Sequence, residues 1–201
     1  RVLDEAGKTV RSLQLNQPAT VVLRNLQPGY YRLVTLPVQR TSRKRIEGEA
    51  FIAVVPPMPN VSLDKWHFGT HVSARPDSLA AGHKLGWRWN RLHDVAHFTK
   101  WPAVQPERER WRFDDETPAR MKAAGYELLG SLDMLPAWLP KASAGREANP
   151  AELTEETFGQ WREYCRRTAE HYKNSITWWE ITNEPNLSGM SPEHYRSLYD
   201  E

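Results

Sequence analysis

The sequence predicts a mixed α/β chain in which antiparallel strands precede the first half, strands one to four, of a parallel (β/α)8 barrel. Residues 8–55 contain short apolar or alternating stretches separated by turn residues, which is typical of antiparallel β-structure. Residues 66–201 alternate between strand and helix patterns, which predicts a parallel sheet with helices outside it, either doubly wound or a barrel. No glycine-rich phosphate loop follows the first of these strands, where residues 69–72 are Gly-Thr-His-Val, and this favours the barrel.

Composition also divides the chain in two. All nine tryptophans and all seven histidines lie beyond residue 65, and residues 1–60 hold nine basic and four acidic side chains, a net charge of +5. The proline-rich residues 56–59 cannot continue a strand ladder, so we expect a linker there. We expect 1–58 to be the C-terminal part of a β-sandwich domain and 59–201 to be the N-terminal half of a barrel. Because the chain opens on Arg1 and closes in the first turns of a helix, we expect it to be a piece of a longer protein.

The first region is expected to form strands that end at turns containing proline or glycine. Four such strands are too few for two packed sheets, which is why we expect the earlier strands of a β-sandwich to be absent. The predicted strands are residues 10–15, 20–23, 30–34 and 51–55.

In the second region, capping residues mark the helices between predicted strands. Asp114 or Asp115 is expected to cap a helix that runs to Lys122, Thr154 to cap a long helix, and Ser191 to cap the last one. The predicted strands are 66–72, 86–92, 126–132 and 176–182, and a short helix is predicted at 78–84. Apolar residues at helical spacing after Thr154 predict a buried stripe of Phe158, Trp161, Cys165 and Tyr172.

Charge and composition exclude several classes of protein. No apolar run is long enough for a membrane-spanning helix, and mean hydropathy is −0.70. A net charge of +2 gives no reason to expect nucleic acid or a membrane surface as a partner. The single cysteine, Cys165, excludes an internal disulfide and a multi-cysteine zinc site, and its apolar neighbours favour a core position over a reactive thiol.

The most informative residues lie at the end of the fourth predicted barrel strand. Asn183 and Glu184 follow that strand directly, at the end of a barrel where catalytic groups gather. A carboxylic acid there can protonate the leaving oxygen of a glycoside, while the neighbouring amide hydrogen-bonds a sugar hydroxyl. This pair therefore indicates cleavage of a glycosidic bond.

Several further motifs occur in the same order as in one group of enzymes. With Trp-Glu-Ile before Asn-Glu-Pro-Asn, residues 178–186 resemble the fourth strand of clan A glycoside hydrolases, which are retaining (β/α)8 enzymes. The resemblance covers roughly residues 66–201. Within the clan, it favours families such as family 39. Its other motifs are Trp-Asn-Arg-Leu at 89–92, W-x-x-V-x-P-E at 101–107, W-x-F-D at 111–114, the third strand from 125, and P-x-W at 136–138.

The resemblance implies a retaining double displacement on an oligosaccharide, polysaccharide or glycoside with a β-linkage, and no cofactor. Glu184 would be the general acid/base, Asn183 the contact to the sugar 2-hydroxyl, and Arg91 a group that hydrogen-bonds the nucleophile. In the clan the nucleophile is a glutamate on strand seven, so it would lie outside this chain. Arg91 could instead neutralise a buried acid.

A second carboxylate, Glu180, lies on the same strand. Four extended residues place it about 13 Å from Glu184, too far for the 5 to 5.5 Å separation of a retaining pair. We therefore expect Glu180 to be structural and paired with a buried base or hydrogen-bond donors.

Histidine and tryptophan side chains near the strand ends are further candidates. His71 and His93 could bind sugar hydroxyls or simply pack, and Trp138 could stack on a sugar ring. A metal site would need His67 with His71, or His93 with His97 on a helix, but the spacing lacks the His-x-His of metal-dependent barrels, so no metal is expected.

Two other functions remain as alternatives, a non-catalytic carbohydrate-binding barrel and a metal-dependent barrel hydrolase. A secreted or periplasmic location would suit a polysaccharide-degrading enzyme, although no residue of the chain specifies it. The sugar, its linkage and the oligomeric state are left open by the sequence.

Overall fold

The computed structural model divides the chain into two compact units, Arg1–Pro59 and Asn60–Glu201. The described residues form two sheets of different type, one antiparallel and one parallel, each within one unit. The structure describes residues 1–15, 20–35, 48–57, 62, 66, 68–139 and 150–200.

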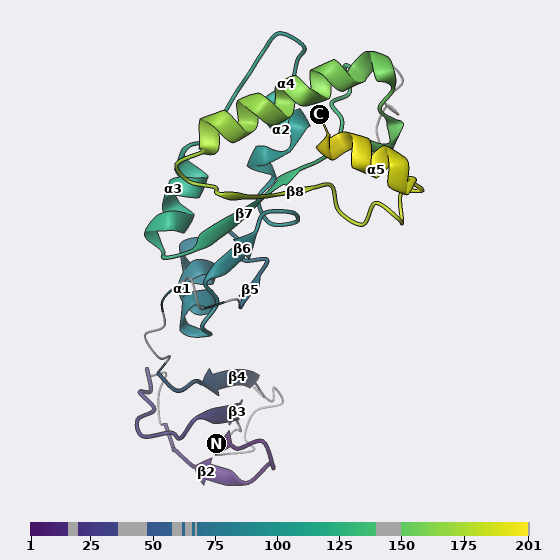
Figure 1. Cartoon of the computed structure of the whole chain (residues 1–201). Coiled ribbons are helices and arrows are strands. Elements are labelled where there is room, and N and C mark those ends of the chain that lie inside the picture. The colour runs from purple at the N-terminus through teal and green to yellow at the C-terminus, as the bar shows by residue number, and fades with distance from the viewer. Residues whose placement is uncertain are drawn as a thin grey trace, which may run out of the picture. The chain divides into compact units, whose positions relative to one another are not determined.

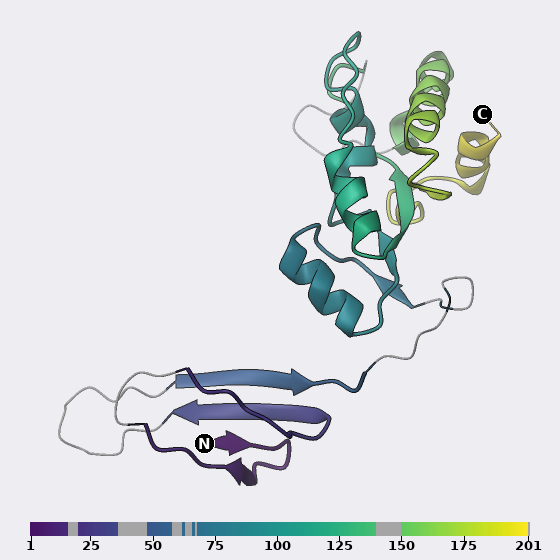
Figure 2. The same cartoon turned by 90° about the vertical axis from the view of Figure 1, so that its left-hand side faces the viewer.

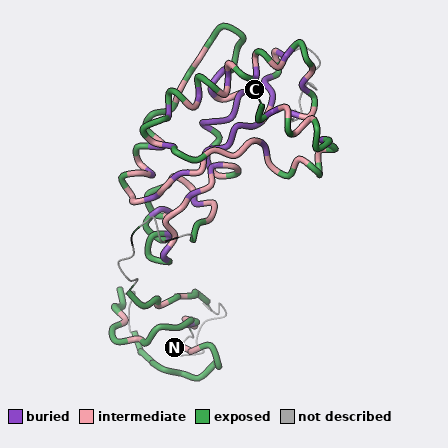
Figure 3. Tube along the Cα trace, viewed as in Figure 1, coloured by how far each residue is buried: buried purple, intermediate pink, exposed green. Residues whose placement is uncertain are grey.

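The first unit is an antiparallel sheet with the strand order β2-β1-β3-β4 in the described part of the chain. Its long strands β3 (Gly29–Thr35) and β4 (Gly48–Val54) pair along their whole length, as Figure 2 shows. The short strand β1 (Val2–Leu3) pairs with β3 on one side and with β2 (Thr9–Arg11) on the other. Figure 3 shows that most of this unit is exposed, whereas buried residues concentrate in the second unit.

One predicted strand of this unit does not form. Residues 20–23 have strand-forming side chains, but they have no strand partner among the described residues and are mostly exposed. A hydrogen bond of 2.8 Å from Arg11 Nη2 to the carbonyl of Arg24 holds the following residues instead. Strand propensity reflects packing against neighbouring strands, so it is not sufficient without such a partner.

The second unit contains a parallel sheet with the order β5-β6-β7-β8, so that each strand lies beside the next one in the described chain (Figure 1). The strands are β5 (Gly69–Thr70), β6 (Trp89–Arg91), β7 (Glu127–Leu132) and β8 (Trp178–Ile181). Each lies within a stretch expected to be a strand. Sequential parallel strands need crossover connections, which are helical here.

Local signals in the sequence account for the helix ends. Helix α1 (Pro76–Lys84) has proline at its first position, and α5 (Pro192–Tyr199) is capped by Ser191, whose Oγ accepts from the His194 N–H. Thr154 forms a reciprocal capping box with Thr157 at the start of α4 (Glu155–Tyr172).

Helix α3 (Glu116–Ala123) follows Asp115, but the carboxylate that accepts the Thr117 N–H, at 3.0 Å, belongs to Asp114. The loop expected after β6 contains two further short helices, the 3-10 helix η2 (His97–Thr99) and α2 (Trp101–Val104). The 3-10 helix η3 (Pro150–Glu152) precedes α4.

Helix α4 packs along a stripe that differs from the expected one. Trp161 and Tyr172 are buried as predicted, whereas Phe158 and Cys165 are only partly buried at the edge of the core. Thr157, Tyr164 and Thr168 are buried in addition. The threonines were not part of the expected stripe because it was read from apolar residues alone.

Two aromatic-rich clusters hold the helices against the sheet. In one, Trp101 stacks on Tyr164 at 5.0 Å between ring centroids, joining α2 to α4. In the other, Met121 of α3 and Leu128 of β7 are fully buried beside Tyr172. No helix in the described part of the chain is long and apolar enough to cross a membrane.

Gly130 in β7 leaves room for the Trp179 ring of the neighbouring strand β8 and for Ile176, which precedes that strand. A Cβ at this position would collide with the Trp179 ring and press on Ile176. We therefore expect Gly130→Ala to destabilise the fold by about 1–3 kcal/mol through overpacking. The measurement is the free energy of unfolding in urea.

A matched substitution on α4 provides the control. A Cβ at Gly159 would meet nothing within 4 Å, so Gly159→Ala should raise stability by about 0.5–1 kcal/mol through helix propensity. Equal unfolding midpoints for the two alanine variants would contradict this packing.

The thiol of Cys165 is expected to be unreactive in the native protein. Burial raises its pKa to about 12, so at pH 8 only about one thiol in ten thousand is the reactive thiolate. A disulfide reagent such as DTNB should label Cys165 only after unfolding in guanidinium. Rapid labelling of the folded protein would show that the side chain is accessible and ionised.

Candidate active site

The carboxyl ends of β5 to β8 meet at one edge of the parallel sheet and carry the predicted site residues. His71 follows β5, Arg91 ends β6, and His93 comes two residues later. Asn183 and Glu184 follow β8 after one intervening residue, Thr182. Five of the six residues that the sequence singled out are therefore placed at the same edge by the register of the strands.

Arg91 is the centre of the contacts at this edge. Its Nε donates to Glu180 Oε2 at 2.7 Å, and its Nη2 donates to Asn183 Oδ1 at 2.8 Å. Its Nη1 lies 3.4 Å from His71 Nε2. A guanidinium can only donate, so the His71 Nε2 must be the acceptor and the proton of the neutral ring lies on Nδ1.

The amide of Asn183 connects Arg91 to Glu184. Because the Asn183 Oδ1 accepts from Arg91, its Nδ2 faces the other way and donates to Glu184 Oε2 at 3.1 Å. Glu184 itself is exposed, whereas Asn183 is half-buried. The carboxyl group is thus oriented by a fixed amide while it stays open to solvent.

A second chain of contacts runs from His71 to the end of β7. Asp94 lies between two imidazole rings, with its Oδ2 3.0 Å from His71 Nδ1 and its Oδ1 2.5 Å from His93 Nδ1. His93 Nε2 lies 3.7 Å from Asp133 Oδ2, and the Asp133 Oδ1 accepts the Thr182 hydroxyl at 2.9 Å. These contacts, with those of Arg91, join the ends of β5, β6, β7 and β8 in one network.

The two histidines also affect the acidity of Asp94. Desolvation raises the pKa of this carboxyl group, but the charge and hydrogen bonds of His93 and His71 outweigh it, so the pKa lies below its ordinary value. Asp94 therefore keeps its carboxylate form to a lower pH than an isolated aspartate would.

The backbone at this edge is held in an unusual conformation. Met134, Thr182 and Glu184 have positive φ angles of 64°, 48° and 47°. For a β-branched residue such as Thr182 this is a true outlier, and each such residue costs about 1–3 kcal/mol. Hydrogen bonds from the Thr182 N–H to Leu132 and from its hydroxyl to Asp133 hold it in place. Strain of this kind is concentrated at functional sites.

Glu180 pairs with a base, which is one of the two kinds of partner that the sequence led us to expect. One of its oxygens accepts from Arg91, and the other is buried without a hydrogen-bond partner in the described part of the chain. The spacing of about 13 Å expected for a straight strand does not apply, because the backbone leaves the extended conformation at Thr182, before Glu184. Arg91 does neutralise a half-buried acid, and it contacts Asn183 as well.

Histidine pairs that could have suggested a metal are arranged differently. His93 and Asp94 lie in a turn, and His97 begins η2, so the helical spacing that two ligands would need is absent there. His67 lies outside the described residues. Over the described ranges, no group of three or more His, Cys, Asp or Glu side chains is arranged to hold a metal ion.

One solved structure resembles this fold. It is a family 39 glycoside hydrolase from the gut symbiont Bacteroides cellulosilyticus WH2, with a TM-score of 0.57 and 18% sequence identity. The match covers 86% of this chain and 37% of that chain. No protein-family model and no curated protein sequence matches the chain. The likeness shows a fold of the family 39 type, while the chain spans well under half the length of that glycoside hydrolase.

Trp138 lies apart from the contacts that surround Arg91. Its ring N–H donates to the carbonyl of Gln105 at 2.9 Å, and its ring packs edge-on against Trp101. It lines a pocket with Trp111 and residues of α4, and none of the lining residues contributes to the Arg91 network. Stacking of Trp138 on a sugar at Glu184 stays a prediction that these contacts do not support.

Sequence reasoning missed Asp133 and Thr182. Asp133 is the first polar side chain after β7, which is the position where strand-end site residues occur, so a signal was present. Thr182 gave no such signal, because nothing in the sequence indicates that a β-branched residue will adopt a positive φ.

Substitutions at Arg91 and Glu180 should have non-additive effects on the free energy of unfolding, because the two side chains are in contact. Both side chains are mostly buried, with exposed fractions of 30% and 20%. In a double-mutant cycle with Arg91→Met and Glu180→Gln, we expect a coupling of about 1.5–3 kcal/mol in the free energy of unfolding, as for hydrogen bonds to charged groups.

The exposed pair Arg75 and Asp77 is the control, because it is also an arginine–carboxylate contact, made through two hydrogen bonds, but both side chains are largely in solvent. Arg75→Met and Asp77→Asn should show a much smaller coupling. A coupling between Arg91 and Glu180 no larger than that of the control would mean that the central pair does not hold β6 to β8.

Proposed function

We propose that the protein is a glycoside hydrolase that cleaves O-glycosidic bonds with retention, and that Glu184 is its general acid/base. The observation that carries this is the placement of an exposed Glu184, oriented by Asn183 and backed by Arg91, at the carboxyl edge of a parallel sheet. The family 39 type of fold supports the proposal.

In this proposal Glu184 transfers protons and Asn183 donates a hydrogen bond. Glu184 in its acid form protonates the oxygen of the departing sugar, and its carboxylate then takes a proton from the attacking water. The exposure of Glu184 leaves room for both steps. The Asn183 Nδ2 carries two hydrogens: one is donated to Glu184, and the proposal assigns the other to a substrate hydroxyl next to the scissile bond.

Retention requires a second carboxylate about 5 to 5.5 Å from the first, to act as nucleophile. Glu180 is unsuited to that role because one of its oxygens is held by Arg91 and the side chain is mostly buried. The proposal therefore places the nucleophile outside residues 1–201. It also treats residues 59–201 as the first half of a (β/α)8 barrel and residues 1–58 as part of a β-sandwich.

Strand order supports the barrel half of this proposal. A doubly wound sheet reverses its order at a switch point, whereas β5 to β8 follow one another without reversal. His71 and His93 would be sugar-contacting residues, and Asp94 would hold both rings through its two oxygens. The substrate would be an oligosaccharide, a polysaccharide or a simple glycoside, with no cofactor and no metal ion.

The acid role of Glu184 is tested with leaving groups of different acidity. Glu184→Gln in the intact protein should lower kcat/KM about 10²–10⁴-fold on glycosides with poor leaving groups, because these need protonation. Activated aryl glycosides should lose far less in the glycosylation step. The measurement is kcat/KM on a panel of aryl glycosides of several sugars.

Glu193→Gln is the matched control, since Glu193 is an exposed glutamate in the first turn of α5. It should leave hydrolysis of every substrate unchanged. An equal loss on good and poor leaving groups with Glu184→Gln would rule out the acid role, and a parent protein inactive on the whole panel would favour a carbohydrate-binding function.

A further inference from the structure

A pocket of about 230 Å³ lies beside α4, and none of its lining residues takes part in the Arg91 network. We call it the Trp111 pocket. Its walls come from the loop before Trp111, the residues after β7, and the first half of α4. The residues that characterise it are Arg108, Trp111, Trp138, Gly159, Gln160 and Glu163.

Two indole rings in the wall are already held in place. Trp138 is fixed by the hydrogen bond of its ring N–H and by the edge of Trp101. Trp111 has the guanidinium of Arg167 4.7 Å from its ring centroid. Rings that are ordered before binding lose little freedom when a ligand packs on them, which favours recognition of an apolar sugar face.

Gln160 brings an acceptor without a partner to the same pocket. Its Oε1 is buried, and no donor in the described part of the chain reaches it. A buried acceptor in this state is costly, and rotation of the Gln160 side chain toward the pocket, where it would meet a ligand hydroxyl, would relieve the cost. This is the second feature that points to a ligand rather than to packing alone.

Gly159 keeps one side of the pocket open. It lies inside α4 without a positive φ, and a Cβ there would meet nothing within 4 Å. Neither backbone conformation nor packing therefore requires glycine at this position, although glycine weakens a helix relative to alanine. The space beside Gly159 remains available to a ligand.

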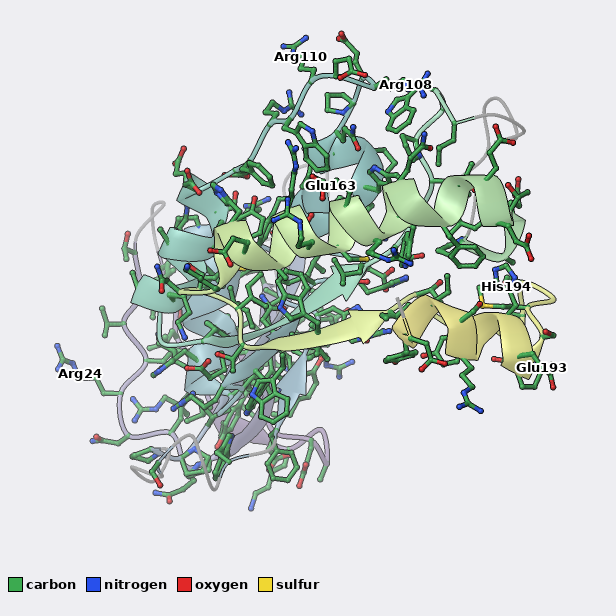
Figure 4. All side chains as sticks on the ribbon, turned by 45° about the horizontal axis from the view of Figure 1, so that its top comes forward. Arg24, Arg108, Arg110, Glu163, Glu193 and His194 are labelled. Atoms are coloured by element: carbon green, nitrogen blue, oxygen red, sulfur yellow. The ribbon has the colours of Figure 1, made fainter. Side chains whose placement is uncertain are left out.

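The charges that line the pocket are of both signs, because both Arg108 and Glu163 of α4 line it (both labelled in Figure 4). Hydrogen bonds from Arg166 and Arg167 lower the pKa of Glu163 to about 2 and offset its charge. Glu109 adds one further carboxylate to the lining. The pocket thus combines charges of both signs, two fixed indole rings and side-chain oxygens that can accept hydrogen bonds. This combination suits a neutral ligand with many hydroxyl groups better than an ion.

We propose that the Trp111 pocket binds a neutral pyranose unit of an oligosaccharide, separately from the site at Glu184. The ligand class follows from the pocket's own walls, so the proposal stands apart from hydrolysis. Such a second site would hold a long substrate while another part of it reaches Glu184.

The test is isothermal titration of the intact protein with xylotetraose, cellotetraose and laminaritetraose, in a Glu184→Gln background that prevents turnover. Gly159→Leu adds a side chain at a lining position where a Cβ meets nothing within 4 Å, and it improves the helix, so thermal unfolding should occur at or above the parent temperature. We expect this variant to weaken the pocket component of binding at least tenfold for one or more of the three probes. Gln160→Leu, which removes the unpartnered acceptor, should act in the same direction.

Arg110→Ala is the control, because Arg110 lies on the same loop as Arg108 but does not line the pocket (Figure 4). It should leave the isotherms unchanged. Identical isotherms for the background protein, Gly159→Leu and Gln160→Leu with all three probes would overturn the proposal. Hydrolysis of a small aryl glycoside by Gly159→Leu with Glu184 restored reports on the catalytic proposal alone, so the two can fail independently.

Discussion

The guanidinium of Arg91 is the group on which the arrangement of the strand ends depends. It donates to Glu180 and Asn183, both from β8 or just after it, and it approaches His71 after β5. A half-buried Glu180 carboxylate would be costly without this partner, and Asn183 would lose the contact that fixes the direction of its amide. The Arg91 side chain therefore both neutralises the Glu180 carboxylate and fixes the direction of the Asn183 amide.

Strained backbone conformations at Thr182 and at Glu184 itself accompany the orientation of the Glu184 side chain. The strand geometry of β8 ends where Thr182 takes a positive φ, and Glu184 repeats this two residues later. Asp133 accepts the Thr182 hydroxyl, so the end of β7 helps to hold the turn at the end of β8. A contact from the neighbouring strand end thus stabilises a backbone conformation that Thr182 by itself disfavours. As a result, the carboxyl group of Glu184 is directed into solvent rather than along the sheet.

Much of the parallel sheet could be predicted because its signals are local. Helix caps such as Ser191 and Thr154 act within a few residues, and each strand lay inside a predicted stretch. The partner of Glu180 was predictable as a base, since a buried carboxylate needs one. The features that the sequence did not specify depend on distant packing. Residues 20–23 have no partner strand among the described residues, and contacts with Gln105 and Trp101 fix the position of Trp138.

The sequence distance across the central contact has a consequence for synthesis. Arg91 and its partners Glu180 and Asn183 are separated by 89 and 92 residues. At roughly 5–20 residues per second, the ribosome needs about 5–20 s to make that intervening chain. During this interval Arg91 lacks both of its partners from the region of β8, and of its three contacts only His71 has been made. The contacts of Arg91 at the strand edge therefore cannot be completed before Asn183 has been synthesised, well after β6 itself.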